Sequence, residues 1–172
     1  MEAAEKCLMT QHVFRALHQA MSNPGTVHDV PQEQEHTDGG HDILLALAET
    51  ILDNEASFCL VGKDGEQLER IVRDLTGSRK GDAAPAFDAP GSTIIYLVAG
   101  FNGGPDSCSF SLRGSGIGPV MSFSVEGIGR DELCGIKDVN KDFPLGVNCI
   151  FVDLMGKIAC IPRSATVIDL RP

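Results

Sequence analysis

A glycine-rich segment after a predicted strand carries the residues of this sequence best suited to bind an anion. Arg113-Gly114-Ser115-Gly116 places an arginine beside alternating glycines, and Pro119 follows shortly afterwards. Glycines free backbone N–H groups to face an anion, and a guanidinium adds charge-assisted hydrogen bonds. A dinucleotide-binding loop would run directly into a helix, whereas Pro119 and an alternating pattern follow here. The other interpretation, which stays open, is a tight connection whose glycines supply positive φ angles.

Arg15, within a predicted helix, is a second candidate for a polar contact. It lies one position from the apolar stripe, so its stem can cover apolar surface while its guanidinium reaches a boundary. It forms either an ion pair on the helix surface or a buried or interface pair with Asp53 or Glu55. Pro24 and Gly25 end the helix, and we expect this terminus to build the fold and the subunit contact.

Arg163 follows Pro162 near the C-terminus and has two interpretations. Its guanidinium either fixes the last strand through a carboxylate or backbone carbonyls, or it faces a partner subunit. Nothing in the residue pattern chooses between them. His18, on the first predicted helix, is expected to be a surface residue.

The remaining histidines and the lysines form no recognisable catalytic or metal-binding set. All five histidines fall within the first 41 residues. His36 and His41 lie in a polar loop rather than on one helical face, which favours a solvated segment over a metal site. Pyridoxal phosphate needs a Schiff-base lysine, and none of the six lysines stands at a strand end beside a phosphate-cradling loop. The sequence predicts no metal, no pyridoxal phosphate and no catalytic residue of its own.

Length, composition and charge limit the classes of protein to which this chain can belong. A chain of 172 residues can bury a core of its own as one domain. The net charge of −10, the absence of Trp and the single Tyr argue against nucleic-acid binding. Six cysteines without a Cys-x-x-Cys pair are expected to be reduced, buried thiols in the cytoplasm. No signal peptide is visible, and no apolar stretch approaches the ~20 residues that span a bilayer.

Hydrophobic periodicity predicts an alternation of helices and strands. Helices are expected over 8–22, 43–54 capped by Asp42, 67–75, and 130–141 with a break near Gly135. Strands are expected over 58–61, 93–99, 107–113, 120–125, 147–154, 157–161 and 166–170, with exposed loops at 31–41 and 76–92. This order predicts an α/β fold, a three-layer αβα sandwich around a mixed sheet, in a single domain spanning 1–172.

Five segments in order along the chain together resemble one known family. They are Phe14-Arg15-Ala16-Leu17 with the turn at Pro24-Gly25, the Leu-rich helix running into 52–55, and the segments 112–117, 143–148 and 161–164. The chain resembles the H subunit of the bacterial carbon–phosphorus lyase core complex, the PhnH family. It departs from the family in its shorter segments around 31–41 and 126–142, in Asn148, where an acidic residue is common, and in Ser164-Ala165, where two threonines are common. These departures bear on a polar contact near the C-terminus more than on the fold.

The resemblance implies an architecture like the large domain of the aspartate-aminotransferase superfamily without its cofactor. It also implies a homodimer that docks with the other core subunits and supports transfer of an alkylphosphonate to ribose C1 of ATP with release of adenine. In this interpretation the structural or interface residues are Arg15, Pro24, Gly25, Asp53, Gly146, Pro162 and Arg163. The alternative is a small anion- or nucleotide-binding enzyme that uses the Arg113 loop.

Overall fold

The computed structural model describes residues 3–31, 39–62, 65–80, 92–101, 103, 107–114, 121–141 and 143–171. Within these ranges the helices are α1 (Ala3–Ser22), α2 (Gly39–Ile51), α3 (Gly65–Thr76) and α4 (Arg130–Val139). The strands are β1 (His28–Asp29), β2 (Ser57–Val61), β3 (Arg79–Lys80), β4 (Thr93–Val98), β5 (Ser107–Gly114), β6 (Met121–Glu126), β7 (Asn148–Asp153), β8 (Lys157–Ile161) and β9 (Ala165–Arg171). The predicted mixture of helices and strands is confirmed.

A mixed sheet in the order β1-β8-β7-β4-β2-β3 forms the centre of the molecule. β4 pairs in parallel with both β2 and β7, and β8 returns antiparallel to β7. From Ile94 to Val98 every residue of β4 is buried, as expected of a strand covered on both faces. The continuous apolar run that predicted an interior strand here is therefore confirmed.

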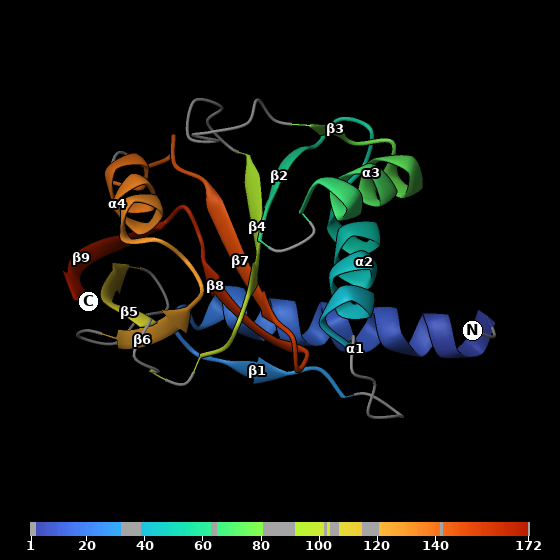
Figure 1. Ribbon diagram of the computed structural model, residues 1–172, viewed down its shortest axis with the longest axis horizontal. Helices are drawn as coiled ribbons and strands as arrows, with labels where there is room; N and C mark the ends of the chain where they lie inside the picture. Colours follow the sequence, from blue (N-terminus) through green and yellow to red (C-terminus); the bar gives the residue numbers. More distant parts are fainter. Residues whose placement is uncertain are drawn as a thin grey trace.

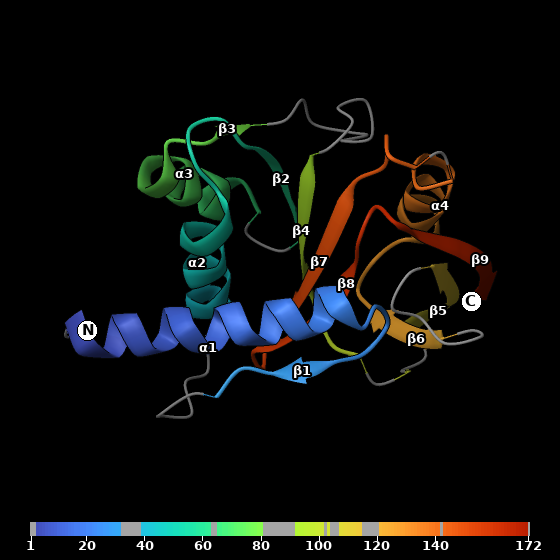
Figure 2. The same cartoon turned by 180° about the vertical axis from the view of Figure 1, so that it is seen from behind.

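The two faces of this sheet are covered differently, as Figure 1 and Figure 2 show from opposite sides. Helices α1, α2 and α3 cover one face, and their apolar residues share a core with Phe58, Ile95 and Ile150 of the sheet. Helix α4 and a second, small sheet cover the other face, where they enclose Tyr96 and Phe151. The predicted three-layer α/β architecture is confirmed, with sheet as well as helix in one outer layer.

The second sheet joins three strands that the sequence predicts individually, in the order β6-β5-β9. On one face of the β5–β6 pair, Ser109 hydrogen-bonds Ser124 at 2.6 Å and Ser111 hydrogen-bonds Ser122 at 3.0 Å, each between hydroxyl oxygens. Leu112, which alternates with these serines, is fully buried. The alternation therefore predicts the faces of β5, whereas it contains no information on which sheet the strand joins.

Several helix boundaries differ from the predictions. Helix α2 begins at Gly39, so Asp42 lies in its first turn and does not cap it. Gly40 in this first turn packs closely against the main sheet, since a Cβ there would lie 2.5 Å from the carbonyl oxygen of Asp153. Helix α4 runs unbroken through Gly135, because Leu133 and Ile136 on either side anchor it in the core. Helix α1 starts at Ala3, five residues before the predicted boundary.

The cysteines are free thiols, and their burial is less complete than predicted. Cys149 and Cys160 are buried in the main sheet, whereas Cys7 is exposed and the other three are intermediate. Burial raises the pKa of Cys149 and of Cys160, which keeps both thiols protonated. None of the helices in the described ranges is long and apolar enough to cross a membrane.

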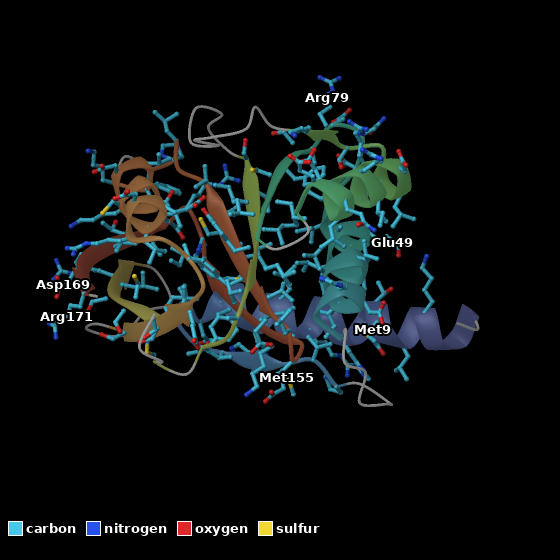
Figure 3. The ribbon with its side chains drawn as sticks, viewed as in Figure 1. Met9, Glu49, Arg79, Met155, Asp169 and Arg171 are labelled. Atoms are coloured by element: carbon cyan, nitrogen blue, oxygen red, sulfur yellow. The ribbon has the colours of Figure 1, made fainter. Side chains whose placement is uncertain are left out.

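The turn between β7 and β8 is organised by one buried carboxyl group. Asp153 is 3% exposed, and its Oδ1 accepts hydrogen bonds from the backbone N–H groups of Met155 at 2.9 Å and Lys157 at 2.8 Å. Met155 itself lies on the exposed turn (Figure 3). Burial raises the pKa of Asp153, and the hydrogen bonds from Lys157 and Met155 offset only part of this effect. The carboxyl group is therefore needed as an acceptor, while its charge is unfavourable in the folded protein.

We expect Asp153→Ala to lower the free energy of unfolding by about 2–3 kcal/mol, because two backbone N–H groups lose their acceptor. Asp153→Asn keeps an acceptor oxygen and should cost less. Because the native pKa of Asp153 is raised, its stabilising contribution is fully present below the unfolded pKa of about 4 and falls as pH rises through the native pKa. The stability of wild type relative to Asp153→Asn should therefore fall with rising pH, measured by urea unfolding across the acidic range. The exposed Asp74→Asn is the control, and a pH-independent difference would contradict the assignment.

Candidate functional site

The glycine-rich segment and the C-terminal turn meet where β5 ends and β9 begins. Gly114 is the register partner of Ala165, and Arg113 is the partner of Thr166. A Cβ on Gly114 would lie 2.6 Å from the carbonyl oxygen of Ser164 and 3.1 Å from the Cα of Ala165. Only glycine permits this approach, so Gly114 serves strand packing directly. Ser115 and Gly116, the rest of the candidate anion loop, lie outside the described residues.

A buried asparagine joins the end of α4 to the start of β7. Asn140 is 1% exposed; its Nδ2 donates to the carbonyl of Val147 at 3.1 Å, and its Oδ1 accepts from the N–H of Val147 at 2.8 Å. A Cβ on Gly146 would overlap Oδ1 of Asn140 and would lie 3.2 Å from the Cβ of Arg163. Gly146 is thus enclosed between two side chains from other parts of the chain. Sequence reasoning missed Asn140, since an isolated asparagine at a helix end gives no sign of its partner.

Asn148 links the same region to the C-terminal turn. Its Oδ1 accepts a hydrogen bond from the backbone N–H of Arg163 at 3.1 Å, and its own N–H donates to the carbonyl of Ser92 at 3.1 Å. An amide oxygen therefore makes the polar contact near the C-terminus at the position where an acidic residue is common in the family that the chain resembles. The backbone of Arg163 fixes the turn, whereas its guanidinium has no hydrogen bond or ion pair in the described part of the chain.

The turn after α1 packs against the same end of the small sheet, where β5 ends and β6 begins. Gly25 has a φ of 85°, and a Cβ there would lie 2.8 Å from Cγ of Met121 and 3.2 Å from Cδ1 of Leu112. The N–H of Gly25 also donates to the carbonyl of Cys160 at 3.4 Å. Pro24 beside it is buried. The predicted role of this terminus in building the fold is consistent with these contacts.

Four segments far apart in the sequence, 14–25, 112–114, 143–148 and 161–164, therefore meet around the small sheet and the entry to β7. A family model described as bacterial phosphonate metabolism protein (PhnH) matches residues 2–89 and 88–168. The chain belongs to this family. No curated protein sequence matches the chain well enough to count as a relative.

In this PhnH-family chain, two arginines lie beside the junction of these segments. Arg113 is exposed and Arg163 is half-buried, and neither side chain forms an ion pair among the described residues. By contrast, Arg171 at the end of β9 is paired with Asp169 at 2.9 Å (Figure 3). The junction therefore presents two cations that have no acidic partner among the described residues, on a protein whose net charge is −10.

Arg15 and Asp53, also candidates in this PhnH-family chain, do not meet. Both are exposed, and the ion pairs found in the described ranges include neither. Oδ1 of Asp53 instead accepts from the backbone N–H groups of Glu55 and Ala56, each at 2.9 Å. Asp53 thus shapes the turn between α2 and β2, and Arg15 on the surface of α1 has no ion-pair partner in the part of the chain that the structure describes.

Sequence reasoning also missed a group of buried and half-buried titratable side chains beneath α4. Among the described residues the enclosed hydroxyl of Tyr96 has no hydrogen-bond partner at a suitable distance and angle, and Glu132 of α4 lies near it. Burial raises the pKa of Tyr96, of Glu132 and of the Cys59 thiol, and the charges of Glu69 and Glu132 raise that of Cys59 further. A thiol held protonated in this way is a poor nucleophile. Cys59 is therefore not an activated nucleophile.

The enclosure of Gly146 can be tested with a double-mutant cycle. Asn140→Ala leaves the N–H and carbonyl of Val147 without their partners and should lower the free energy of unfolding by about 2–3 kcal/mol. Gly146→Ala forces its new Cβ onto Oδ1 of Asn140 and should cost about 2 kcal/mol. In the double variant the overlap is gone, so the combined cost should fall short of the sum by at least about 1 kcal/mol.

The measurement is urea unfolding of all four proteins. Gly129→Ala is the matched control, because its Cβ would meet no atom within 4 Å. Additive costs for Asn140→Ala and Gly146→Ala would contradict the contact.

Proposed function

We propose that this chain is a non-autonomous subunit of the carbon–phosphorus lyase core complex. In this role it forms a homodimer of single-domain subunits in the cytoplasm and binds the other core subunits. It supports their transfer of an alkylphosphonate to ribose C1 of ATP, with release of adenine, and does not supply the reactive groups itself. Membership of the phosphonate metabolism family is the starting point for this proposal.

The observation that carries the proposal is the exposure of large apolar side chains within the segments that resemble the family. Phe14 is 55% exposed, Phe143 is 65% exposed and Leu145 is 58% exposed. Phe143 and Leu145 lie two residues apart in the segment before β7, and exposed apolar side chains that adjoin one another are typical of contact surfaces. A catalytic role would instead favour polar side chains held in mutual hydrogen bonds.

The contacts made by the same segments support this interpretation. Gly25, Gly114 and Gly146 are each placed where a side chain would collide with another part of the chain. The amides of Asn140 and Asn148 bond to backbone groups. These residues build the surface, and the polar atoms of the two asparagine side chains form hydrogen bonds within the fold.

The proposal is tested by co-expressing the tagged chain with the other core subunits and determining the composition of the purified complex by native mass spectrometry. We expect the chain to co-purify in a defined ratio and the complex to release adenine from ATP in the presence of methylphosphonate. The isolated chain should show no such turnover. Turnover by the isolated chain, or failure to co-purify, would overturn the proposal.

Anion binding is the second candidate function, and the unpaired cations at the junction favour it. Arg113 and Arg163 come from segments that touch through Gly114 and Ser164. A polyphosphate could accept charge-assisted hydrogen bonds from both guanidinium groups. This candidate places an ATP-binding function on the chain itself.

Titration calorimetry with ATP, and separately with methylphosphonate, distinguishes the two functions. If the chain binds ATP here, Arg113→Ala and Arg163→Ala should each weaken binding by about tenfold, equivalent to about 1.4 kcal/mol. The exposed Arg70→Ala on α3 is the control and should leave binding unchanged. Absence of saturable binding to wild type removes the second candidate and leaves the subunit role.

A further inference from the structure

The outward side of α1 carries a stripe of exposed residues that the fold does not use. We call this the α1 outer face, and it consists of Cys7, Gln11, Phe14, Arg15 and His18, all of which are exposed. Their spacing places them on one side of the helix, away from the core residues Val13, Ala16, Leu17 and Ala20. The rings of Phe14 and His18 stack with centroids 6.4 Å apart.

The first turns of this helix are less buried than the rest, although Met9 packs against the core and Lys6 pairs with Glu49 of α2. No residue from Lys6 to His12 is buried, and the first fully buried side chain is Val13. In Figure 1 and Figure 2 the N-terminal turns of α1 project past α2. Isolated helical turns are marginal in water, and helices in proteins are stabilised mainly by packing of an apolar face. A second surface packed against α1 would supply the missing contacts.

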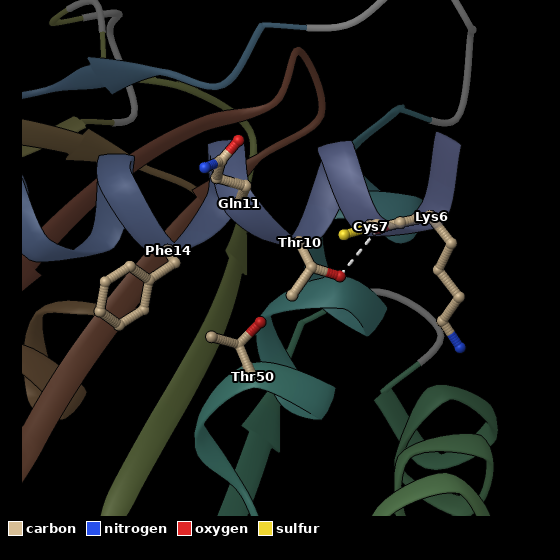
Figure 4. A pocket seen from close by; sticks show the side chains of 6 residues that line it. All are labelled: Lys6, Cys7, Thr10, Gln11, Phe14 and Thr50. Carbon is tan, nitrogen blue, oxygen red and sulfur yellow. Dashed lines mark hydrogen bonds between the residues drawn. The ribbon is translucent and has the colours of Figure 1, made fainter. Parts of the chain in front are cut away.

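A shallow pocket lies between α1 and α2 beside the outer face. Figure 4 shows its lining, which consists of Lys6, Cys7, Thr10, Gln11, Phe14 and Thr50. Lys6 is held at its rim by an ion pair with Glu49 at 2.8 Å. The exposed ring of Phe14 forms one wall. The pocket therefore offers an apolar contact for one inserted side chain.

The charge of this face is opposite to that of the protein as a whole. Residues 6–28 contain no Asp or Glu, although the chain has 24 acidic residues and a net charge of −10. Arg15 has no ion pair or hydrogen bond in the described part of the chain. The face thus suits an acidic partner surface. A second copy that presented the same face would bring the cations of both copies together without a carboxylate between them.

We infer that the α1 outer face binds a helical segment of another core subunit, which inserts an apolar side chain beside Phe14 and places carboxylates opposite Arg15. This inference rests on the proposed function, since that role supplies the partner. Apolar insertion into a groove flanked by complementary charge is a common way in which a helix is recognised. The apolar contact sets the lifetime of the complex, whereas the charges govern its association rate and salt dependence.

Affinity for the other core subunits tests the inference, measured by biolayer interferometry at low and high salt. Arg15→Glu changes one exposed, unpaired side chain and should weaken binding by about tenfold at low salt, with a smaller loss at high salt. Phe14→Asp should weaken binding by about a hundredfold at both salt concentrations. Arg73→Glu and Leu75→Asp on α3 are the matched controls, since both side chains are exposed, and they should bind like wild type.

The outcomes separate this inference from the proposed function. If wild type binds the core subunits and the Arg15 and Phe14 variants bind equally well, the α1 outer face is not the contact, while the proposed function stands. If wild type does not bind them at all, both fail. If either substitution changes the mass of the chain alone by light scattering, a second copy occupies the face and the inference is wrong. Circular dichroism establishes folding of each variant, and Arg15→Glu remains decisive if Phe14→Asp does not fold.

Discussion

The pair of hydrogen bonds between the amide of Asn140 and the backbone of Val147 fixes the point at which the chain enters the main sheet. β7 starts at Asn148, directly after Val147, and lies between β4 and β8. The position of β7 therefore bears on its register with β4 and on its register with β8. Asn148 extends the same arrangement to Ser92 before β4 and to the turn before β9. The amides of Asn140 and Asn148 therefore connect the entry to the main sheet with the turn that leads into β9 of the small sheet.

Glycine allows these segments to approach one another closely, and this packing explains why glycines occur at Gly25, Gly114 and Gly146. At Gly114 the obstacle to a side chain is backbone, at Gly146 it is the Asn140 amide, and at Gly25 it is the side chain of Met121. Such contacts require the absence of a Cβ and do not require a ligand. The family segments surrounding these glycines are thus explained first by packing, and an anion at Arg113 would be an additional use of a site that the fold already needs.

Periodicity predicted the long elements of this fold because their side chains repeat against a single core. It could not predict β1 or β3, which are two residues long and show no pattern, nor that β5, β6 and β9 form their own sheet. The ion pair considered between Arg15 and Asp53 does not form, because Asp53 accepts hydrogen bonds from nearby backbone N–H groups instead. Aspartate favours such local bonds, which compete with distant partners. Asn140 was missed because its role depends entirely on a contact seven residues away.

The distribution of charge separates the interior from the surface in this protein. Burial raises the pKa of the thiols of Cys149 and Cys160 and of the Tyr96 hydroxyl, so these interior groups stay neutral. Charged groups are consequently concentrated at the surface, where all the ion pairs of the described residues have at least one partner with substantial exposure. The exterior of the protein is acidic overall, but α1 carries Arg15 and has no carboxylate from residue 6 to its end at residue 22. An acidic partner surface can therefore approach α1 with little repulsion from the helix itself.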